Sequence, residues 1–479
     1  MTKGSPMHPL DHIARLDGVA QAELVFRGEL TTLDLIDACQ RRLELLNPLL
    51  RAVVASDFDA ARSHVRDRPV SAGPFAGVPF LFKDVCATPG LRCAFGSRLF
   101  AHHVPASGSP FTERVAAAGL ITVGKSASSE FGLIGSTETL LEGVTHNPWR
   151  LTLSAGGSSG GAAAAVAAGI VPLAHASDGG GSIRGPAASV GLFGLKPSRG
   201  RTVPSNATRT PFDSLLSDGC ISRSVRDTAL FLSVVESSEL PPLGYVREPS
   251  PRRLRIGYTS TTLLGTEPEL DCRRALEATV GLCRELGHHV QAAAAPRIDG
   301  RALSQAYFTT AGSALAGMVD SLGPMLGRGV DADDLEPFTL GLIASARAAL
   351  ARGVDVSADF ERATRAYLEA LAPYDLLLTP TYATRPWDLG WLSPLTPHDE
   401  LIERTERSVC YTPIHNVAGC PAMSVPLYWT EDDAPIGSHF AAAPGRDAVL
   451  LELAYELERA LPWAERWAPH SFPRLLSDR

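Results

Sequence analysis

The sequence of 479 residues lacks three features that would each indicate a particular class of protein. It has no run of 18 or more apolar residues, so we expect no transmembrane helix and no membrane partner. It has no excess of basic residues: 44 Lys and Arg against 52 Asp and Glu give a net charge of −8, which argues against a nucleic-acid partner. Its eight cysteines are scattered without metal-ligand spacing, so we expect buried thiols and no metal site.

The sequence also lacks a leader-like segment and internal repeats. Its first 17 residues contain no apolar stretch of the kind found in secretory leaders, so we expect a cytoplasmic protein. No low-complexity tract occurs apart from alanine-rich segments. Hydrophobic residues make up 45% of the chain and charged residues 20%, which predicts a large buried core.

Helical and strand-like patterns alternate along the chain, which predicts an α/β fold with a mixed or largely parallel sheet. The pattern predicts helices over 11–27, 31–46, 112–118, 162–168, 225–236, 269–286 and 448–461, and a mostly helical region over 300–372. It predicts strands over 77–84, 120–123, 170–175, 254–258, 290–294, 375–379, 422–429 and 437–442. Thr31 and Asp34 have the spacing of a capping box, and Asn47-Pro48 is expected to close that helix.

Two serine-centred glycine clusters lie close together in 154–188. The first is Gly156-Gly157-Ser158-Ser159-Gly160-Gly161, and the second is Asp178-Gly179-Gly180-Gly181-Ser182-Ile183-Arg184. Glycine is used where the backbone bends sharply or approaches a ligand closely. The two clusters therefore predict loops that place serine hydroxyls and backbone N–H groups at one site.

Three interpretations compete for this segment. A phosphate-binding loop requires Lys-Ser or Lys-Thr after the second glycine, but Ala162-Ala163 follows here. A nucleophile elbow of the G-x-S-x-G type would make Ser159 the nucleophile. Its partners would be a downstream acid and a histidine such as His288, His398, His415 or His439. In the third interpretation Ser182 is the nucleophile, and a helix beginning near it turns glycine N–H groups towards a developing oxyanion.

The third interpretation coincides with a family resemblance. The motif GGSSGG, an alanine-rich spacer, DGGGSIR and an upstream strand that ends in lysine resemble the amidase signature family. The resemblance runs from about residue 15 to residue 463, and the tail 435–463 resembles the branch that includes 6-aminohexanoate cyclic-dimer hydrolase. Further matching motifs are Gly77-Val78-Pro79, Phe82-Lys83-Asp84, Asn147-Pro148-Trp149, Gly194-Leu195-Lys196-Pro197, 376–381 and Pro421-Ala422.

The resemblance implies a fold and a set of residue roles. The expected fold is a single amidase domain over 1–479, in which a mixed, largely parallel sheet is covered on both faces by helices. The catalytic core is expected over about 60–235, and a variable substrate-facing helical region over about 300–372. The implied catalytic residues are Lys83 as the base, Ser158 as a bridging serine after a cis peptide bond, and Ser182 as the nucleophile. The other implied site residues are Gly179, Gly180 and Gly181 in the oxyanion hole, Asp178, Arg184 and Ser159 in support, and Thr137 and Glu138 at the substrate.

The environment of Lys83 is expected to lower its pKa. A lysine has a pKa near 10.4, so burial must lower it by roughly 2–3 pH units before the amine acts as a base near neutrality. Phe80 and Phe82 supply apolar surroundings, and strand alternation turns Asp84 to the opposite face.

The resemblance implies an amidase without a cofactor that acts on a small-molecule amide, and it is compatible with a homodimer. Two alternatives remain open. One is an amide-forming acyltransferase that uses the same relay, and the other is a glutamine-hydrolysing subunit that supplies ammonia to a partner. Segments 135–143, 300–345 and 405–420 are expected to surround the substrate, with a partly apolar channel in 302–345.

Overall fold

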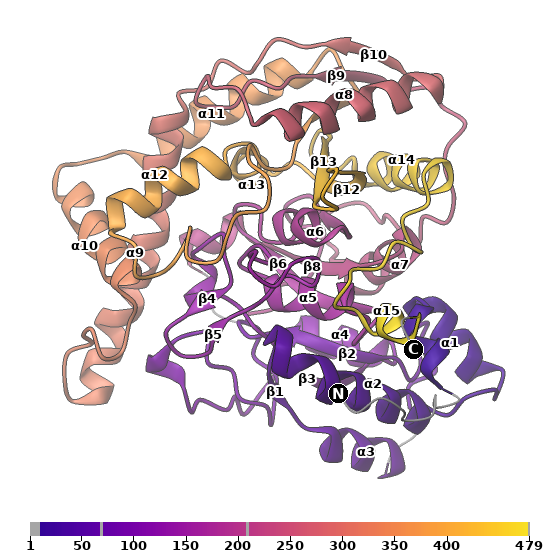
Figure 1. Cartoon of the computed structure of the whole chain (residues 1–479). Coiled ribbons are helices and arrows are strands. Elements are labelled where there is room, and N and C mark those ends of the chain that lie inside the picture. Colours follow the sequence, from indigo (N-terminus) through magenta and orange to yellow (C-terminus); the bar gives the residue numbers. More distant parts are fainter. Residues whose placement is uncertain (1–9, 68–69, 207–209, 478–479) are drawn as a thin grey trace.

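An eleven-stranded sheet runs through the molecule (Figure 1). The computed structural model describes residues 10–67, 70–206 and 210–477. The first nine residues, in which we expect no leader, lie outside the described part. In spatial order the strands are β1 (Val53–Ser56), β3 (Ile121–Ser126), β2 (Pro79–Lys83), β6 (Leu173–Asp178), β8 (Ser217–Ser222), β7 (Phe193–Lys196), β12 (Ala422–Trp429), β13 (Pro435–Ala441), β11 (Leu376–Pro380), β9 (Arg255–Tyr258) and β10 (His289–Ala292).

Helices cover the sheet, and a separate two-stranded sheet joins β4 (Glu138–Thr139) to β5 (Gly143–Val144). The α-helices are α1 (Gly18–Phe26), α2 (Thr32–Leu50), α3 (Phe58–Asp67), α4 (Pro110–Ala117), α5 (Gly160–Ala167), α6 (Arg184–Val190), α7 (Val225–Val235), α8 (Leu270–Glu285), α9 (Gly300–Leu326), α10 (Pro337–Ala351), α11 (Val356–Leu371), α12 (His398–Ser408), α13 (Pro413–Val417), α14 (Asp447–Ala460) and α15 (Phe472–Ser477). Short 3₁₀ helices are η1 (Asp11–Arg15), η2 (Arg98–Phe100), η3 (Glu130–Gly132) and η4 (Pro211–Leu215).

The α/β class and the mixed sheet are confirmed, but the sheet is not largely parallel. The pairs β2–β3, β2–β6, β9–β11 and β9–β10 are parallel. The pairs β1–β3, β6–β8, β7–β8, β7–β12, β12–β13 and β11–β13 are antiparallel. Alternation of helices and strands favours parallel crossovers. However, β8 lies next to β7, and β13 lies next to β12, as antiparallel neighbours. No described α-helix connects the two strands of either pair.

The helix predicted over 31–46 continues as α2 to Leu50, so Pro48 does not end it. The capping box of Thr31 and Asp34 is confirmed. A proline near the end of a helix removes only its own N–H bond, and here the chain continues for two more residues. The helix ends at Arg51, which has a left-handed conformation and donates its N–H to the Asn47 carbonyl.

Strand alternation distributes the core over both faces of the sheet. Leu81 of β2 and Ala174 of β6 pack in one cluster with α2, α5 and α6. Phe80 and Phe82 point to the other face and pack with Phe231 of α7 in a second cluster, which α4 also joins. The predicted covering of both faces by helices is confirmed, and it encloses the end of β2 in apolar surroundings.

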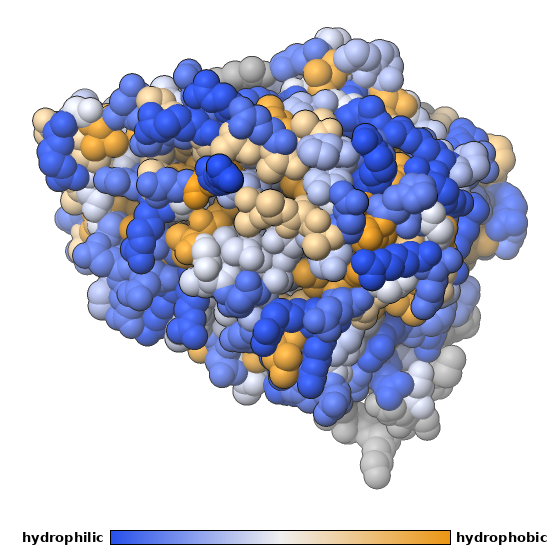
Figure 2. All heavy atoms as spheres, turned by 90° about the horizontal axis from the view of Figure 1, so that it is seen from above, coloured by the Kyte–Doolittle hydropathy of each residue, from blue (hydrophilic) through white to orange (hydrophobic). Residues whose placement is uncertain are grey.

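Helices α9 to α12 gather at one side of the sheet (Figure 1). Three of these helices, α9, α10 and α11, confirm the helical character predicted for 300–372. In the view from above, hydrophilic side chains cover most of the visible face, and hydrophobic ones form separate patches towards its middle (Figure 2). No helix in the described ranges is both long enough and apolar enough to span a bilayer.

Candidate active site

Two neighbouring parallel strands bring the predicted site residues together. Leu81 of β2 is in register with Ala174 of β6, and both strands run in the same direction. Their carboxyl ends therefore meet at one edge of the sheet, where Lys83 ends β2 and Asp178 ends β6. Ser158 lies in the loop before α5, which packs on β6.

The Lys83 side chain is 1% exposed and reaches the first glycine cluster. Its Nζ donates to Ser158 Oγ at 2.7 Å and to Ser177 Oγ at 3.1 Å. Burial lowers the pKa of Lys83 to about 7, against the opposing charges of Asp178 and Asp218. The predicted lowering is confirmed, and a substantial share of the amine is neutral at pH 7.

Asp84 does not pair with its neighbour Lys83. Its carboxylate accepts hydrogen bonds from the N–H groups of Ala94 at 3.1 Å and Gly96 at 3.3 Å. Burial raises the pKa of Asp84 to about 6. The alternation argument is therefore consistent with the structure, because no carboxylate adjacent in sequence holds Lys83 in its charged form.

The peptide bond between Gly157 and Ser158 is cis, as the resemblance implies. Thr137 braces this loop: its Oγ1 accepts a hydrogen bond from Gly160 N at 2.9 Å. The same hydroxyl lies within donating distance of the carbonyl oxygens of Gly156 (2.9 Å) and Ser158 (3.2 Å). Thr137 thus holds the backbone on both sides of the cis bond.

The expected contact of Thr137 and Glu138 with substrate stays a prediction, and the protein itself engages both side chains. Thr137 is 2% exposed and Glu138 is 4% exposed, and neither lines the two cavities described below. The Glu138 carboxylate accepts hydrogen bonds from Ser136 Oγ at 2.6 Å and from Gly390 N. The segment lies beside the site as expected, but hydrogen bonds within the protein already engage these two side chains.

Asp178 and Arg184 form a fully buried ion pair, with Arg184 Nη2 2.9 Å from Asp178 Oδ1. Burial acts to raise the pKa of Asp178, but the charge and hydrogen bonds of Arg184 hold it below its usual range. The carboxylate also accepts from Gly181 N at 2.7 Å and Ile183 N at 3.1 Å. The pair therefore fixes the loop on both sides of Ser182, which is the bracing role expected for it.

The predicted oxyanion hole needs one correction. The N–H of Gly181 is directed to Asp178 Oδ1, so it does not face a substrate. Within the described part of the chain, the backbone N–H groups of Gly179, Gly180 and Ser182 have no hydrogen-bond acceptor. These three groups are the donors that the loop leaves open.

Glycine is required at two positions of this loop. A Cβ at Gly180 would lie 2.7 Å from the Tyr307 hydroxyl oxygen, and a Cβ at Gly181 would lie 2.4 Å from Thr412 Oγ1. Gly181 also has φ of +137°, which other residues rarely adopt. The close approach of Tyr307 from α9 therefore depends on the bare backbone at 180.

Ser182 is partly exposed and lines both cavities that meet at the glycine loops. Ser158 lines one of them with Lys83. Among the hydrogen bonds of the described residues, none joins the hydroxyls of Ser158 and Ser182. The structure thus brings all three predicted catalytic residues to one site and makes the Lys83–Ser158 contact directly.

Ser159 has no partner suited to a nucleophile. It lies at the N-cap of α5, and its hydroxyl donates to the Ser177 carbonyl at 3.4 Å without capping the helix. Two of the histidines considered for an elbow, His415 and His439, contact Arg184 instead, at 3.3 Å and 3.1 Å. The other two lie against acidic residues, His288 at 3.1 Å from Glu456 and His398 at 2.9 Å from Asp399. This geometry does not support the elbow interpretation.

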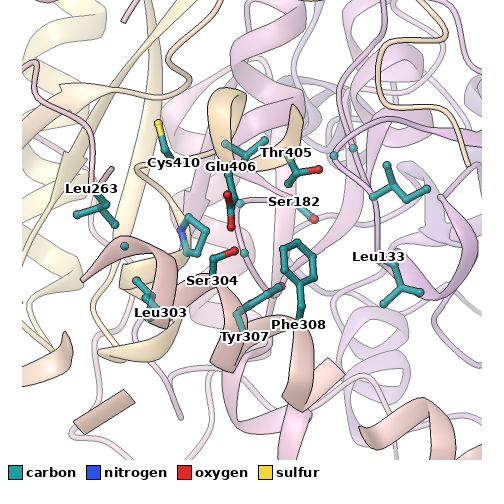
Figure 3. A pocket seen from close by; sticks show the side chains of 18 of the residues that line it. Leu133, Ser182, Leu263, Leu303, Ser304, Tyr307, Phe308, Thr405, Glu406 and Cys410 are labelled. Atoms are coloured by element: carbon teal, nitrogen blue, oxygen red, sulfur yellow. The ribbon is translucent and has the colours of Figure 1, made fainter. Parts of the chain in front are cut away.

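Two cavities surround Ser182. The first, of about 790 Å³, lies between the glycine loops and α9 and α12 (Figure 3). The second, of about 1910 Å³, extends along Lys83, Ser158 and the middle of α9. As expected for 300–345 and 405–420, residues from both segments line the first cavity. Ala311, Ala314 and Leu315 line the second cavity and account for its apolar character.

Sequence reasoning missed three residues of the site: Tyr307, Thr412 and Glu406. Tyr307 lines both cavities, Thr412 donates to the Gly180 carbonyl at 2.6 Å, and Glu406 lines the first cavity. No sequence signal identifies them, because each lies far along the chain from the glycine clusters. Among described residues no group of three or more His, Cys, Asp or Glu side chains is placed to hold a metal ion.

Comparison with known proteins places the chain among amide hydrolases. The family model described as Amidase matches residues 34–451. AmiC of Mycobacterium tuberculosis (strain ATCC 25618 / H37Rv), named as an inferred amidase, is 37% identical over 464 residues, which cover 96% of this chain and 98% of AmiC. The 6-aminohexanoate-cyclic-dimer hydrolase of Pseudomonas sp. (strain NK87) is 34% identical over 482 residues, covering 94% and 96%.

The solved structures agree with this class. A structure of 6-aminohexanoate cyclic dimer hydrolase matches with a TM-score of 0.85 and 31% identity, over 95% of this chain and 99% of that chain. The chain belongs to the amidase signature family and is a hydrolase of the type that acts on amide C–N bonds.

Proposed function

We propose that the protein hydrolyses a small-molecule carboxylic amide through an acyl-enzyme on Ser182. The observation that carries this proposal is the 2.7 Å hydrogen bond between Lys83 Nζ and Ser158 Oγ, combined with a pKa of about 7 at Lys83. A neutral amine in contact with a serine hydroxyl is a competent general base.

The proposed relay moves one proton along three side chains. Lys83 takes the proton of Ser158 while Ser158 takes the proton of Ser182, whose Oγ bonds to the amide carbonyl carbon. The N–H groups of Gly179, Gly180 and Ser182 stabilise the oxyanion, and one such donor contributes roughly 3–4 kcal/mol in the transition state. The relay reverses to protonate the departing amine as the C–N bond breaks, and water then releases the carboxylic acid.

The experiment compares two serines, one from each glycine cluster. Ser182→Ala is expected to abolish hydrolysis of an acyl p-nitroanilide and labelling by a fluorophosphonate, read by intact mass. Ser159→Ala is the matched control and is expected to keep most activity, because its hydroxyl only contacts the Ser177 carbonyl. An inactive Ser159→Ala together with an active Ser182→Ala would reject this mechanism.

A further inference from the structure

The first cavity carries a carboxylate in otherwise apolar surroundings. Its wall consists mainly of glycine and of apolar side chains, namely Leu133, Ile134, Leu263, Leu264, Leu303, Phe308 and Val409. Glu406 lies in the same wall, near the end of α12. Figure 3 shows its side chain reaching from α12 with the carboxylate directed into the cavity, on whose wall Ser182 also lies.

The protein gives this carboxylate no counter-charge. Glu406 forms no hydrogen bond or ion pair with any described residue, and no Lys, Arg or His lines the first cavity there. On the same helix, Arg404 is already engaged: it pairs with Glu400 at 2.5 Å and lies over the Trp391 ring. Arg407 is exposed to solvent.

The acidic residues of the second cavity differ from Glu406. Asp218 accepts hydrogen bonds from His175 Nε2 at 3.1 Å and Ser205 N at 2.9 Å. Asp213 caps η4 by accepting a hydrogen bond from Thr210 N. The protein satisfies both of these carboxylates internally, whereas it leaves Glu406 to be satisfied by water or by whatever occupies the cavity.

A partly desolvated carboxylate favours a cationic occupant. Apolar walls lower the local dielectric and strengthen its attraction for a positive charge. A neutral or anionic group that displaced the water around Glu406 would leave the carboxylate without a partner, at a free-energy penalty. Ser304 of α9 also lines the cavity and offers a hydroxyl oxygen as an acceptor for an ammonium N–H.

We propose that Glu406 makes the enzyme selective for amides of which one arm ends in a protonated amine. The apolar walls hold the methylene chain of that arm, and Glu406 binds the ammonium group while the amide carbonyl lies at Ser182. This inference rests on the proposed function, because it identifies the substrate class of the same site. Glu406 acts in binding and takes no part in the proton relay.

The kinetic test uses two kinds of substrate, each with matched controls and over a range of chain lengths. The acyl p-nitroanilides end in ammonium, methyl or carboxylate, and monoacetylated diamines with N-acetylalkylamine controls place the charge on the leaving side. We expect the wild-type enzyme to prefer ammonium over methyl at least tenfold in kcat/KM at its best chain length. Tenfold corresponds to about 1.4 kcal/mol.

Variants of α12 assign that preference to one carboxylate. Glu406→Gln is expected to reduce it at least fivefold, and Glu406→Lys to favour the carboxylate-terminated chain. Glu403→Gln is the matched control, because Glu403 is exposed on the same helix and lines neither cavity. The preference for ammonium over methyl is expected to persist in this variant. Equal or better turnover of methyl chains at every length, or a preference that survives in Glu406→Gln, would overturn the proposal.

A binding measurement separates this inference from the proposed function. In Ser182→Ala, calorimetry with n-alkylammonium ions and the n-alkanols of equal length requires no turnover. Tighter binding of the ammonium ion, lost in Ser182→Ala/Glu406→Gln, supports the inference even if no amide is hydrolysed. Equal binding of both ligands contradicts it even if wild-type protein hydrolyses neutral amides.

Discussion

The pH dependence of turnover follows from the burial of Lys83. Burial lowers its pKa from 10.5 to about 7, so about half of the amine is neutral at pH 7, compared with roughly one molecule in 3000 for an unperturbed lysine. The difference corresponds to ~5 kcal/mol in favour of the neutral form. If neutral Lys83 is the base, kcat/KM rises with pH, is half-maximal near pH 7 and falls about tenfold per pH unit below pH 6.

The assay uses an uncharged substrate, so that the ionisation of Glu406 or of a substrate amine does not enter the profile. Initial rates with hexanoyl p-nitroanilide between pH 5 and pH 9 give the midpoint in kcat/KM. Lys83→Met is expected to lose at least about 10²-fold in kcat/KM, the lower range for removal of a general base.

A second buried lysine provides the necessary control. Burial, assisted by the charge of Arg184, also lowers the pKa of Lys196 to about 7, and its Nζ donates to the Pro197 carbonyl at 2.6 Å. The midpoint is expected to remain near pH 7 in Lys196→Met, because the midpoint does not depend on how much protein is folded. A profile that is flat from pH 5 to pH 9, or whose midpoint disappears in Lys196→Met, would refute the assignment to Lys83.

Two further predictions concern the scaffold of the site. Arg184→Met is expected to lower the free energy of unfolding by about 3–5 kcal/mol in urea titrations, because it leaves the buried Asp178 carboxylate without its ion-pair partner; a loss below about 1 kcal/mol would contradict this. Thr137→Val is expected to lower kcat about tenfold with little change in KM, because it frees the loop around Ser158. Thr139→Val is the control for Thr137, since its hydroxyl only accepts from Glu142 N, and equal kcat in both variants would count against the bracing role.

The glycine clusters show how far the sequence specifies the site. They and the strand that ends at Lys83 could be located by pattern, and the family resemblance supplied the contact between Lys83 and Ser158, which are 75 residues apart. The direction of each N–H group could not be predicted. The N–H of Gly181 is directed away from the site because it donates to Asp178 Oδ1, and that geometry depends on the exact turn after β6.

The roles of side chains in the cavity walls were less predictable. Thr137 and Glu138 lie in the segment expected beside the substrate, yet neighbouring backbone groups engage both. In the sequence, Glu406 looks like the other acidic residues of α12. Only its packing against the first cavity distinguishes it from the exposed Glu403. The mixed sheet was predicted, but which strands pair in antiparallel fashion could not be, since pairing partners depend on tertiary contacts.

The first cavity draws its walls from two separate stretches of chain. Residues within 132–182 contribute the glycine loops and Ser182, whereas residues within 263–413 contribute the surfaces of α9 and α12. Under the proposed function, the proton relay lies within 83–182, whereas the proposed ammonium site lies on α9 and α12. A chimera that takes α9 and α12 from another family member would exchange the walls around the substrate and leave Lys83, Ser158 and Ser182 on their native supports.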